Sequence, residues 1–345
     1  MKQILIASYS LIAAVSGAGF ASGQEIMCYF ARFGRAGILG IAVFAAVFAL
    51  FSFAVMYTAG RIRAESFDSF LDIFPGKALR NIIKWSVGIF SFAVYAVMIA
   101  AAGGIGAMLT PFPPSLCALV CAACCALLLC RGAEGAFRLN GVFGIFLTAG
   151  IVTCCFYILR YREHHVFAQT AAAVSDSFIY SGYNLISLTP VMAVFGLKLK
   201  DPRCAAAVSV ISAAAMFLMT SLMFALLSMY ANRVELGEFP MLTLAFRQNK
   251  TVGTFYCVMI ATAVITTLLS SGGSVAGAFR FDKRRMPIFM MTAAAYLISG
   301  AGFGRLVDTA YRFCGIAGGI LTAVIVFFCI RASFMAGKEK LNQKI

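Results

Sequence analysis

The stretch SGAGFASGQE (Ser16–Glu25) interrupts an apolar run that extends from residue 4 to residue 31. Its three glycines, Gly17, Gly19 and Gly23, fall within seven residues. Glycine favours a local loss of helix, because fixing it in a helix costs more conformational entropy than fixing any other residue. A dinucleotide-binding fingerprint is excluded, since Ser22 stands where its third glycine would fall. The stretch therefore predicts a break in an otherwise apolar helix.

The composition places this break inside a membrane. The chain has 345 residues, of which 62% are hydrophobic and 12% charged, against about 25% charged in an average soluble domain. A spanning helix takes about 20 apolar residues, so there is room for about ten spans and no sizeable soluble domain. The net charge of +15 is explained by Lys and Arg at span ends rather than by nucleic-acid binding. Most of the twelve cysteines lie in apolar segments, where a thiol acts as a small hydrophobe.

Ten spans are expected in a single all-α transmembrane domain. They cover residues 4–31, 36–60, 82–109, 115–131, 139–160, 169–196, 204–230, 251–279, 286–303 and 305–332. With a cytoplasmic N-terminus, the inner connections and ends hold more than twice as many Lys and Arg as the outer ones, which predicts that both termini are cytoplasmic.

The longer connections point to an inverted repeat. Residues 61–80 join spans 2 and 3 on the inner side, and residues 232–250 join spans 7 and 8 on the outer side. They lie five spans apart on opposite faces, as expected when a second set of five helices is turned over in the membrane. We expect one repeat over about residues 1–165, another over about 166–335, and a short cytoplasmic tail over 336–345.

A second interruption falls in span 6, the inverted counterpart of span 1. Polar residues and a glycine, Tyr180–Asn184, interrupt the apolar run, and Pro190 follows. Paired interruptions at corresponding positions indicate a transporter's binding site, which predicts discontinuous helices 1 and 6. Close packing through small residues is the alternative for span 1. Free N–H groups at such breaks attract a carboxylate and free carbonyls a cation, which suits a zwitterion with a metal ion. The substrate-binding candidates are Gly17, Ala18, Gly19, Phe20, Ser181, Gly182, Tyr183 and Asn184.

The segment Ser16–Glu25 closely resembles the opening of the YkvI-like family of bacterial membrane proteins. That family looks like a branch of the amino acid-polyamine-cation superfamily, which has the leucine-transporter (LeuT-type) fold. The resemblance covers the whole chain in helix count and order, and its motifs lie in span 1 and, more weakly, at Tyr183-Asn184. It implies a multi-pass transporter of the bacterial cytoplasmic membrane and does not name a solute.

The same resemblance implies a sodium site. Thr267-Leu268-Leu269-Ser270-Ser271 is similar to the stretch that supplies one carbonyl and two hydroxyl oxygens to sodium in sodium-coupled members, and hard cations prefer oxygen ligands. The remaining carbonyls would come from Ala13 and Ser16. The alternative is that these hydroxyls bond back to their own helix. Span 5 lacks the lysine that replaces this sodium in some proton-coupled relatives, which favours sodium.

Tyr95 lies near the centre of span 3, where the sodium symporters use a tyrosine hydroxyl on the substrate carboxylate. The alternative for Tyr95 is a packed side chain whose hydroxyl has one hydrogen-bond partner.

Three ionisable residues lie at similar depth near the outer ends of spans 1, 6 and 10: Glu25, Asp176 and Arg312. Ionisable groups in a bilayer usually face a cavity or a partner. We expect Arg312 to pair with Glu25 or Asp176 as an outer gate above the cavity. A static ion pair is the alternative, and Asp308 is a competitor for Arg312.

These features together predict an alternating-access secondary transporter that imports a small amino acid or related zwitterion with sodium. No cofactor and no obligate protein partner are expected. A proton-coupled carrier remains open, as does an amino-acid sensor, since the fold resembles the membrane subunit of spore germinant receptors. An enzyme is not expected, because no HExxH or GxSxG motif is present.

Overall fold

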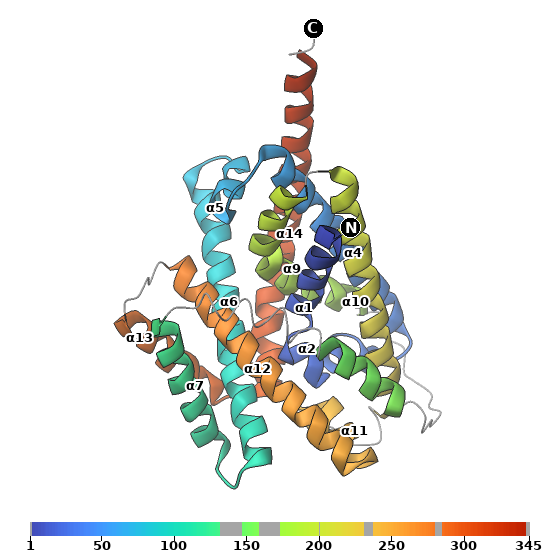
Figure 1. The fold of residues 1–345 in the computed structure, drawn as a ribbon, viewed down its shortest axis with the longest axis vertical. Coiled ribbons are helices and arrows are strands. Elements are labelled where there is room, and N and C mark those ends of the chain that lie inside the picture. Colours follow the sequence, from blue (N-terminus) through green and yellow to red (C-terminus); the bar gives the residue numbers. More distant parts are fainter. Residues whose placement is uncertain are drawn as a thin grey trace.

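The computed structural model describes residues 2–131, 147–158, 173–199, 201–230, 237–279 and 285–342, with side chains described as far as residue 334. Within these ranges the chain forms helices and no strands, as the all-α prediction requires. Figure 1 shows one bundle in which the start of α1 and the end of α14 both lie in the upper half of the view.

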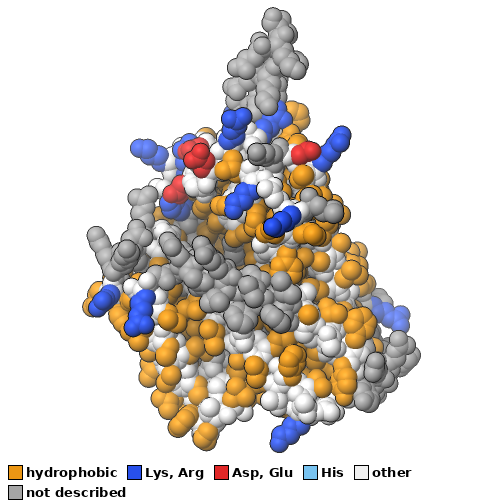
Figure 2. Space-filling view, viewed as in Figure 1, with side chains coloured by type: hydrophobic (Ala, Val, Ile, Leu, Met, Phe, Trp, Pro, Cys, Tyr) orange, Lys and Arg blue, Asp and Glu red, His pale blue; other side chains and the backbone are white. Residues whose placement is uncertain are grey.

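Seven of the described helices are long and apolar enough to cross a membrane. They are α4 (Ala36–Ile62), α6 (Lys77–Leu109), α7 (Pro114–Arg131), α9 (Ala173–Lys198), α10 (Pro202–Tyr230), α12 (Lys250–Ala278) and α14 (Phe303–Asn342). Each coincides with a predicted span, so the chain is a multi-pass membrane protein. In Figure 2 hydrophobic side chains cover most of the face shown, while most of the visible Lys and Arg side chains gather at its upper end.

The other predicted spans correspond to shorter or broken helices. Span 5 corresponds to the apolar helix Leu147–Ile158, and the rest of residues 139–160 lies outside the described ranges. Span 9 corresponds to α13 (Arg285–Ser299), and span 1 begins with α1 (Lys2–Val15). The count of ten spans therefore stays a prediction.

The predicted break in span 1 is confirmed. After α1, Ser16 and Gly17 leave the helix, and the chain continues as α2 (Ala18–Ser22) and α3 (Gln24–Tyr29). The Gly17 amide donates to the Val15 carbonyl at 2.7 Å, whereas in a continuous helix it would donate to Ala13. Gly23, between α2 and α3, has a φ of 82°, a left-handed conformation that glycine adopts without strain.

Helix 6 is not broken, and this prediction was wrong. The helix α9 runs without interruption through Tyr180–Asn184 and past Pro190. The polar side chains are satisfied within the helix: the Ser181 hydroxyl donates to the Ser177 carbonyl at 2.7 Å, and Asn184 Nδ2 donates to the Tyr180 carbonyl at 3.0 Å. Gly182 lets α14 approach, since a Cβ built on it would lie 2.2 Å from the Gly315 carbonyl oxygen. The glycine thus serves helix packing.

The two long connections hold short helices at opposite ends of the bundle (Figure 1). One end carries α5 (Phe67–Phe70) and the 3-10 turn Leu71–Ile73, and the other carries α11 (Pro240–Gln248). We call the end that carries α5 the basic end. The last residues of α4 and the first turns of α6 lie there and supply Arg61, Arg63, Lys77, Arg80 and Lys84. Ser66 and Ser69 form a capping box for α5. Ion pairs fasten the connection to α6, with Lys84 2.6 Å from Asp68 and Arg80 2.5 Å from Asp72.

The helix α9 lies at the centre of the packing, against α4 and α14, while α12 packs along α6 and α4 along α10. The short helix α2 is fixed to α12, because the Tyr256 hydroxyl donates to the Ala21 carbonyl at 2.7 Å. The break in the first helix is therefore held between α9 and α12, where a cavity forms.

Candidate functional site

A cavity of about 170 Å³ lies where the broken first helix meets α6, α9, α12 and α14. Its lining consists of Ala13, Ala14, Val15, Gly17, Ala18, Gly19, Glu25, Ser91, Val94, Met98, Tyr183, Asn184, Ser187, Leu188, Val191, Thr267, Ser270, Ser271, Ser274 and Tyr311. At about 30 Å³ of liquid volume per water molecule, this is room for about five or six waters. The space suits a small solute.

The structure places five of the nine predicted substrate-binding residues on this lining: Gly17, Ala18, Gly19, Tyr183 and Asn184. Phe20 is fully buried in the core. Ser181 and Gly182 face their own helix and α14, as described above. The unbroken course of α9 explains these two positions, because a continuous helix presents only one side to the cavity.

Tyr95 does not line the cavity. Its hydroxyl lies 3.0 Å from the Thr292 hydroxyl on α13, and its ring packs against Gly272. The Thr292 hydroxyl lies 2.8 Å from the Ile288 carbonyl of its own helix. Tyr95 is therefore a buried tyrosine with one bonded hydroxyl, as the alternative interpretation stated.

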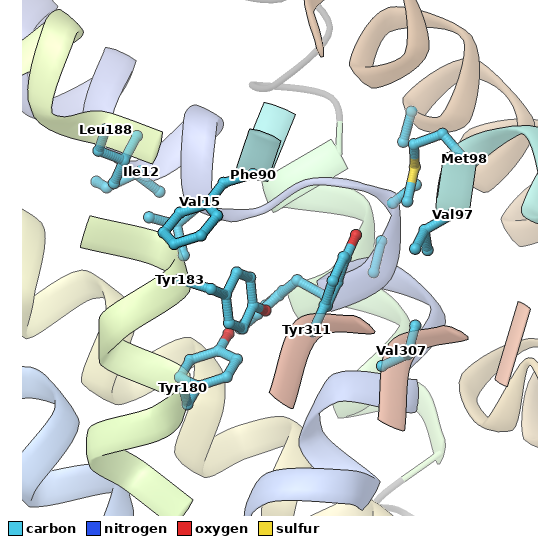
Figure 3. Close-up of a cluster of buried hydrophobic side chains, with 14 of the residues drawn as sticks. Ile12, Val15, Phe90, Val97, Met98, Tyr180, Tyr183, Leu188, Val307 and Tyr311 are labelled. Atoms are coloured by element: carbon cyan, nitrogen blue, oxygen red, sulfur yellow. The ribbon is translucent and has the colours of Figure 1, made fainter. Parts of the chain in front are cut away.

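Tyrosine side chains close the cavity at the end away from α5. Tyr180 and Tyr183 project from α9 and Tyr311 from α14, with Tyr183 between the other two (Figure 3). The Tyr183 and Tyr311 rings are stacked with centroids 4.6 Å apart, and the Tyr180 and Tyr183 centroids are 5.5 Å apart. Tyr29 of α3 adds a fourth ring, 5.3 Å from Tyr180. This cluster, the tyrosine cluster, consists of Tyr29, Tyr180, Tyr183 and Tyr311.

Glu25 faces the cavity beside the tyrosine cluster. Only 5% of the residue is exposed, and its Oε2 accepts a hydrogen bond from the Tyr180 hydroxyl at 3.2 Å. Its Oε1 lies over Gly19, where a Cβ would come within 2.1 Å. The ion pairs given for the described residues at this end involve Asp176 and Asp308 and leave Glu25 out. Glu25 is therefore not the partner of Arg312, although it was predicted as one of two candidates.

Arg312 pairs with Asp176 instead. Its two terminal nitrogens lie 3.1 Å from the two carboxylate oxygens of Asp176. Arg32 also binds Asp176, and Asp308 lies 3.6 Å from Arg32 and 3.5 Å from Arg312. This ion cluster, formed by Arg32, Asp176, Asp308 and Arg312, joins the α3–α4 connection to α9 and α14. Arg32 was counted in the sequence only as a connection residue.

The residues predicted to bind sodium lie close together. Ala13, Thr267, Ser270 and Ser271 line the cavity, and a Cβ on Gly17 would lie 3.4 Å from the Thr267 hydroxyl. The Ser270 and Ser271 hydroxyls donate to the Thr267 carbonyl at 3.0 and 2.7 Å. This back-bonding was the alternative to sodium binding, yet it directs the protons into the helix and leaves hydroxyl lone pairs free for a cation.

Ser16 is arranged differently. Its hydroxyl points to the Met216 sulfur at 3.8 Å, and the residue lines a neighbouring pocket of about 480 Å³ between α1, Leu147–Ile158 and α12. Ala13, Gly17 and Thr267 line both spaces. The predicted ligand from Ser16 is its carbonyl, which lies at the break beside these residues.

The cavity continues toward the basic end. A vestibule of about 620 Å³ lies between α5, α6, α9 and α12, and it includes Asp68 and Lys84. The vestibule and the cavity share the lining residues Ser91, Ser187, Val191 and Ser274. The site is thus bordered on one side by Tyr183 and Tyr311 of the tyrosine cluster and meets the vestibule on the other.

Sequence reasoning missed several lining residues, chiefly Ser91, Ser187, Ser274 and Tyr311. Ser187 and Ser274 each stand four residues after a candidate, Tyr183 and Ser270, so helical spacing placed them on the same face. Ser91 stands four residues before the candidate Tyr95, although Tyr95 itself does not line the cavity. Tyr311 carried no such signal, because no substrate-binding candidate was placed on its helix.

A broken first helix packed against a hydroxyl-bearing membrane helix, around a buried cavity, defines a fold shared with membrane transporters. MhsT, in a crystal structure with L-phenylalanine, matches with a TM-score of 0.66 and 16% identity, over 92% of this chain and 88% of MhsT. A Na⁺-coupled sialic acid symporter in an outward-open state matches with a TM-score of 0.63 and 12% identity, over 95% of this chain and 78% of the symporter. Mhp1 in an inward-facing conformation matches with a TM-score of 0.59 and 14% identity, over 96% of this chain and 76% of Mhp1. The leucine-transporter (LeuT-type) fold is therefore confirmed.

Two proteins of Bacillus subtilis (strain 168) are similar in sequence. The membrane protein YkvI is 22% identical over 325 residues, which are 89% of this chain and 91% of YkvI. YyaD is 23% identical over 348 residues, or 96% of this chain and 97% of YyaD. No protein-family model matches the chain. The resemblance to YkvI is confirmed along most of the chain.

Proposed function

We propose that the chain is a secondary active transporter that carries a small amino acid or related zwitterion together with sodium by alternating access. The observation that carries this proposal is the cavity at the break of the first helix, closed at one end and meeting a vestibule at the other. A carrier of this kind exposes one central site to each side of the membrane in turn. The Na⁺-coupled sialic acid symporter of similar fold supports sodium coupling.

The break offers backbone groups to a carboxylate. The amides of Ala18, Gly19 and Phe20 have no backbone acceptor in the described part of the chain, and Ala18 and Gly19 line the cavity. Unpaired amides at a helix start favour negative charge. The substrate carboxylate would bind there, and Tyr183 and Asn184 of α9 would border the rest of the solute.

Sodium would bind where α1 ends against α12. The proposal uses five oxygens: the carbonyls of Ala13, Ser16 and Thr267 and the hydroxyls of Ser270 and Ser271. The Thr267 carbonyl accepts from both serine hydroxyls in this structure, so sodium binding there requires these two hydroxyls to turn away from it. The carbonyl of Ala13 is available because the Gly17 amide bonds elsewhere. An oxygen set with no net charge suits an ion that must also leave on each cycle.

The orientation follows from charge. If the basic end faces the cytoplasm, as the distribution of Lys and Arg favours, both termini are cytoplasmic and the vestibule opens inward. The ion cluster of Arg32, Asp176, Asp308 and Arg312 then acts as an outer gate, closed in this state. The two inverted repeats, about residues 1–165 and 166–335, belong to the same proposal.

Thermal unfolding of the purified protein tests the proposal, with each amino acid added in sodium and again in potassium. A ligand that binds only the folded state raises stability by mass action. We expect at least one amino acid to raise the unfolding temperature in sodium and not in potassium. Equal shifts in both salts would favour proton coupling. Uptake by liposomes containing only this chain distinguishes a carrier from a sensor, which would bind without accumulating the solute.

A further inference from the structure

We infer that Glu25 is the anchor for an ammonium group, so that the carried solute is recognised mainly as an amine. The inference rests on the proposed function and narrows its substrate class. It predicts that amines without a carboxylate bind the cavity, and that acids without an amine do not.

The first argument is the placement of the charge. Glu25 lies on the lining with 5% of the residue exposed, and no Lys, Arg or His stands among the residues that line the cavity. The nearby arginines, Arg32 and Arg312, pair with Asp176 and Asp308. A buried charged carboxylate without a cation is strongly unfavourable in a membrane, so Glu25 is neutral until a cation binds beside it. A cationic ligand group would remove this penalty.

The second argument is the hydrogen-bonding character of the cavity lining. The hydroxyls of Ser187, Ser270, Ser271 and Ser274 all donate to carbonyls of their own helices. A hydroxyl that has given away its proton presents only lone pairs. Asn184 likewise uses its Nδ2 on the Tyr180 carbonyl, which leaves its Oδ1 as an acceptor. These five side chains of α9 and α12 thus offer acceptors to the cavity, as an ammonium group with three donors requires.

The third argument is the tyrosine cluster. The Tyr180 hydroxyl donates to Glu25 at 3.2 Å, and Tyr183 and Tyr311, whose rings are stacked, line the cavity with Glu25. Figure 3 shows these three tyrosines together. Aromatic rings attract cations through their faces, most strongly where water is excluded. The Tyr183 hydroxyl is buried and has no hydrogen-bond partner of normal geometry in the described residues. A carboxylate beside tyrosine rings is a setting for a cationic head group.

Matched trios of compounds test the inference by thermal unfolding of the full chain in detergent with sodium. One trio is L-alanine, its amine ethylamine and its acid propionate; another is L-valine, isobutylamine and isovalerate. We expect the amino acid and the amine to raise the unfolding temperature and the acid to leave it unchanged. This selectivity is measured on the unaltered protein and needs no variant.

Variants then assign the effect to Glu25. Glu25→Gln keeps the shape and removes the charge, and should weaken binding of both amine and amino acid by at least about tenfold, as loss of a charge-assisted bond implies. Glu25→Asp should give an intermediate affinity. Glu65→Gln, the same change at an exposed glutamate, should match the unaltered protein. Retained helical circular dichroism shows that each variant is folded.

Three results would overturn the inference. Acids that stabilise as well as amines would leave a solute-binding carrier without an ammonium site. An unchanged amine affinity in Glu25→Gln would have the same meaning. The inference would also fail if sodium, added without any other compound, no longer stabilised Glu25→Gln while the amine affinity stayed intact. Glu25 would then be a sodium ligand. If no compound stabilises the protein in either salt, the proposed solute class fails together with the inference.

Discussion

The carboxylate of Glu25 lies directly over Gly19, so close that a Cβ on Gly19 would stand 2.1 Å from Oε1. Between the two residues the chain passes through the left-handed turn at Gly23, which separates α2 from α3. Glu25 is the only carboxylate among the lining residues, and it packs directly against Gly19, where a larger residue would not fit without moving it.

Gly19→Ala should displace Glu25 and weaken solute binding by about tenfold or more, since a charge-assisted contact is lost. The global stability should change little, because the clash is with the end of a flexible side chain. Ligand-induced shifts of the unfolding temperature measure the effect. Gly319→Ala is the control, because Gly319 does not line the cavity and its Cβ would meet only the Phe178 carbonyl oxygen, at an ordinary 3.9 Å. Equal binding by Gly19→Ala and the unaltered protein would contradict the geometry.

Ser270→Ala combined with Ser271→Ala should abolish the difference between sodium and potassium. The fold should be retained, because both hydroxyls bond only within α12. Ser86→Ala is the matched control, since its exposed hydroxyl also bonds back to its own helix, at 2.8 Å from the Ile82 carbonyl. The measurement is the shift of the unfolding temperature on adding the solute, in sodium and in potassium. If the double variant still shows a larger shift in sodium, these residues are not part of the ion site.

Asp176→Asn should loosen the closed end of the bundle. Arg32 and Arg312 would keep only Asp308, which is half exposed, and the loss of a buried charged partner costs about 1–3 kcal/mol. Hydrogen exchange of the α3 segment, Gln24–Tyr29, should become faster, while exchange in α5 should not change. Equal protection of α3 in both proteins would indicate that the ion cluster is a static contact.

Tyr95→Phe should leave solute affinity unchanged. The hydroxyl it removes bonds to Thr292 outside the cavity, so the expected effect is a loss of stability of about 1 kcal/mol. Titrations of the variant and the unaltered protein by thermal unfolding measure both quantities. A tenfold loss of affinity would mean that Tyr95 reaches the solute in another conformation of the carrier.

Gly182→Ala should destabilise the protein strongly. The added methyl group would meet the α14 backbone, 2.2 Å from the Gly315 oxygen and 2.5 Å from the Gly319 nitrogen, and overpacking of this kind costs about 1–3 kcal/mol. Gly277→Ala is the control, because nothing lies within 4 Å of its Cβ position. The unfolding temperatures of the Gly182→Ala and Gly277→Ala variants, measured in detergent, test this prediction. Similar values would show that α9 and α14 can separate freely.

Much of the fold was predictable because it depends on local properties. Apolar runs marked the long helices, and the glycine spacing marked the break after α1. Span 6 misled the prediction, because Ser181 and Asn184 weaken a helix only when their side chains compete with its hydrogen bonds, and here they bond back within it. Sequence alone does not show that α14 lies against Gly182.

The sequence did not decide between Glu25 and Asp176 as the partner of Arg312. A rise of 1.5 Å per residue holds only along a continuous helix, and the turn at Gly23 interrupts the helix before Glu25. Asp176 and Arg312 lie on the unbroken helices α9 and α14, and there the same count brought the two partners together. Arg32 was not predicted as a partner, because it lies in the connection after α3, whose path depends on tertiary packing.

The unbroken course of α9 has a consequence for how the proposed carrier function can evolve. Backbone groups exposed by a broken helix recognise a solute in the same way whatever the side chains are. Here one wall of the cavity has such groups, and the opposite wall presents Tyr183, Asn184 and Ser187 from an intact helix. Single substitutions at these positions would alter solute preference while the backbone scaffold stays the same, so related carriers could diverge in selectivity without redesign of the fold.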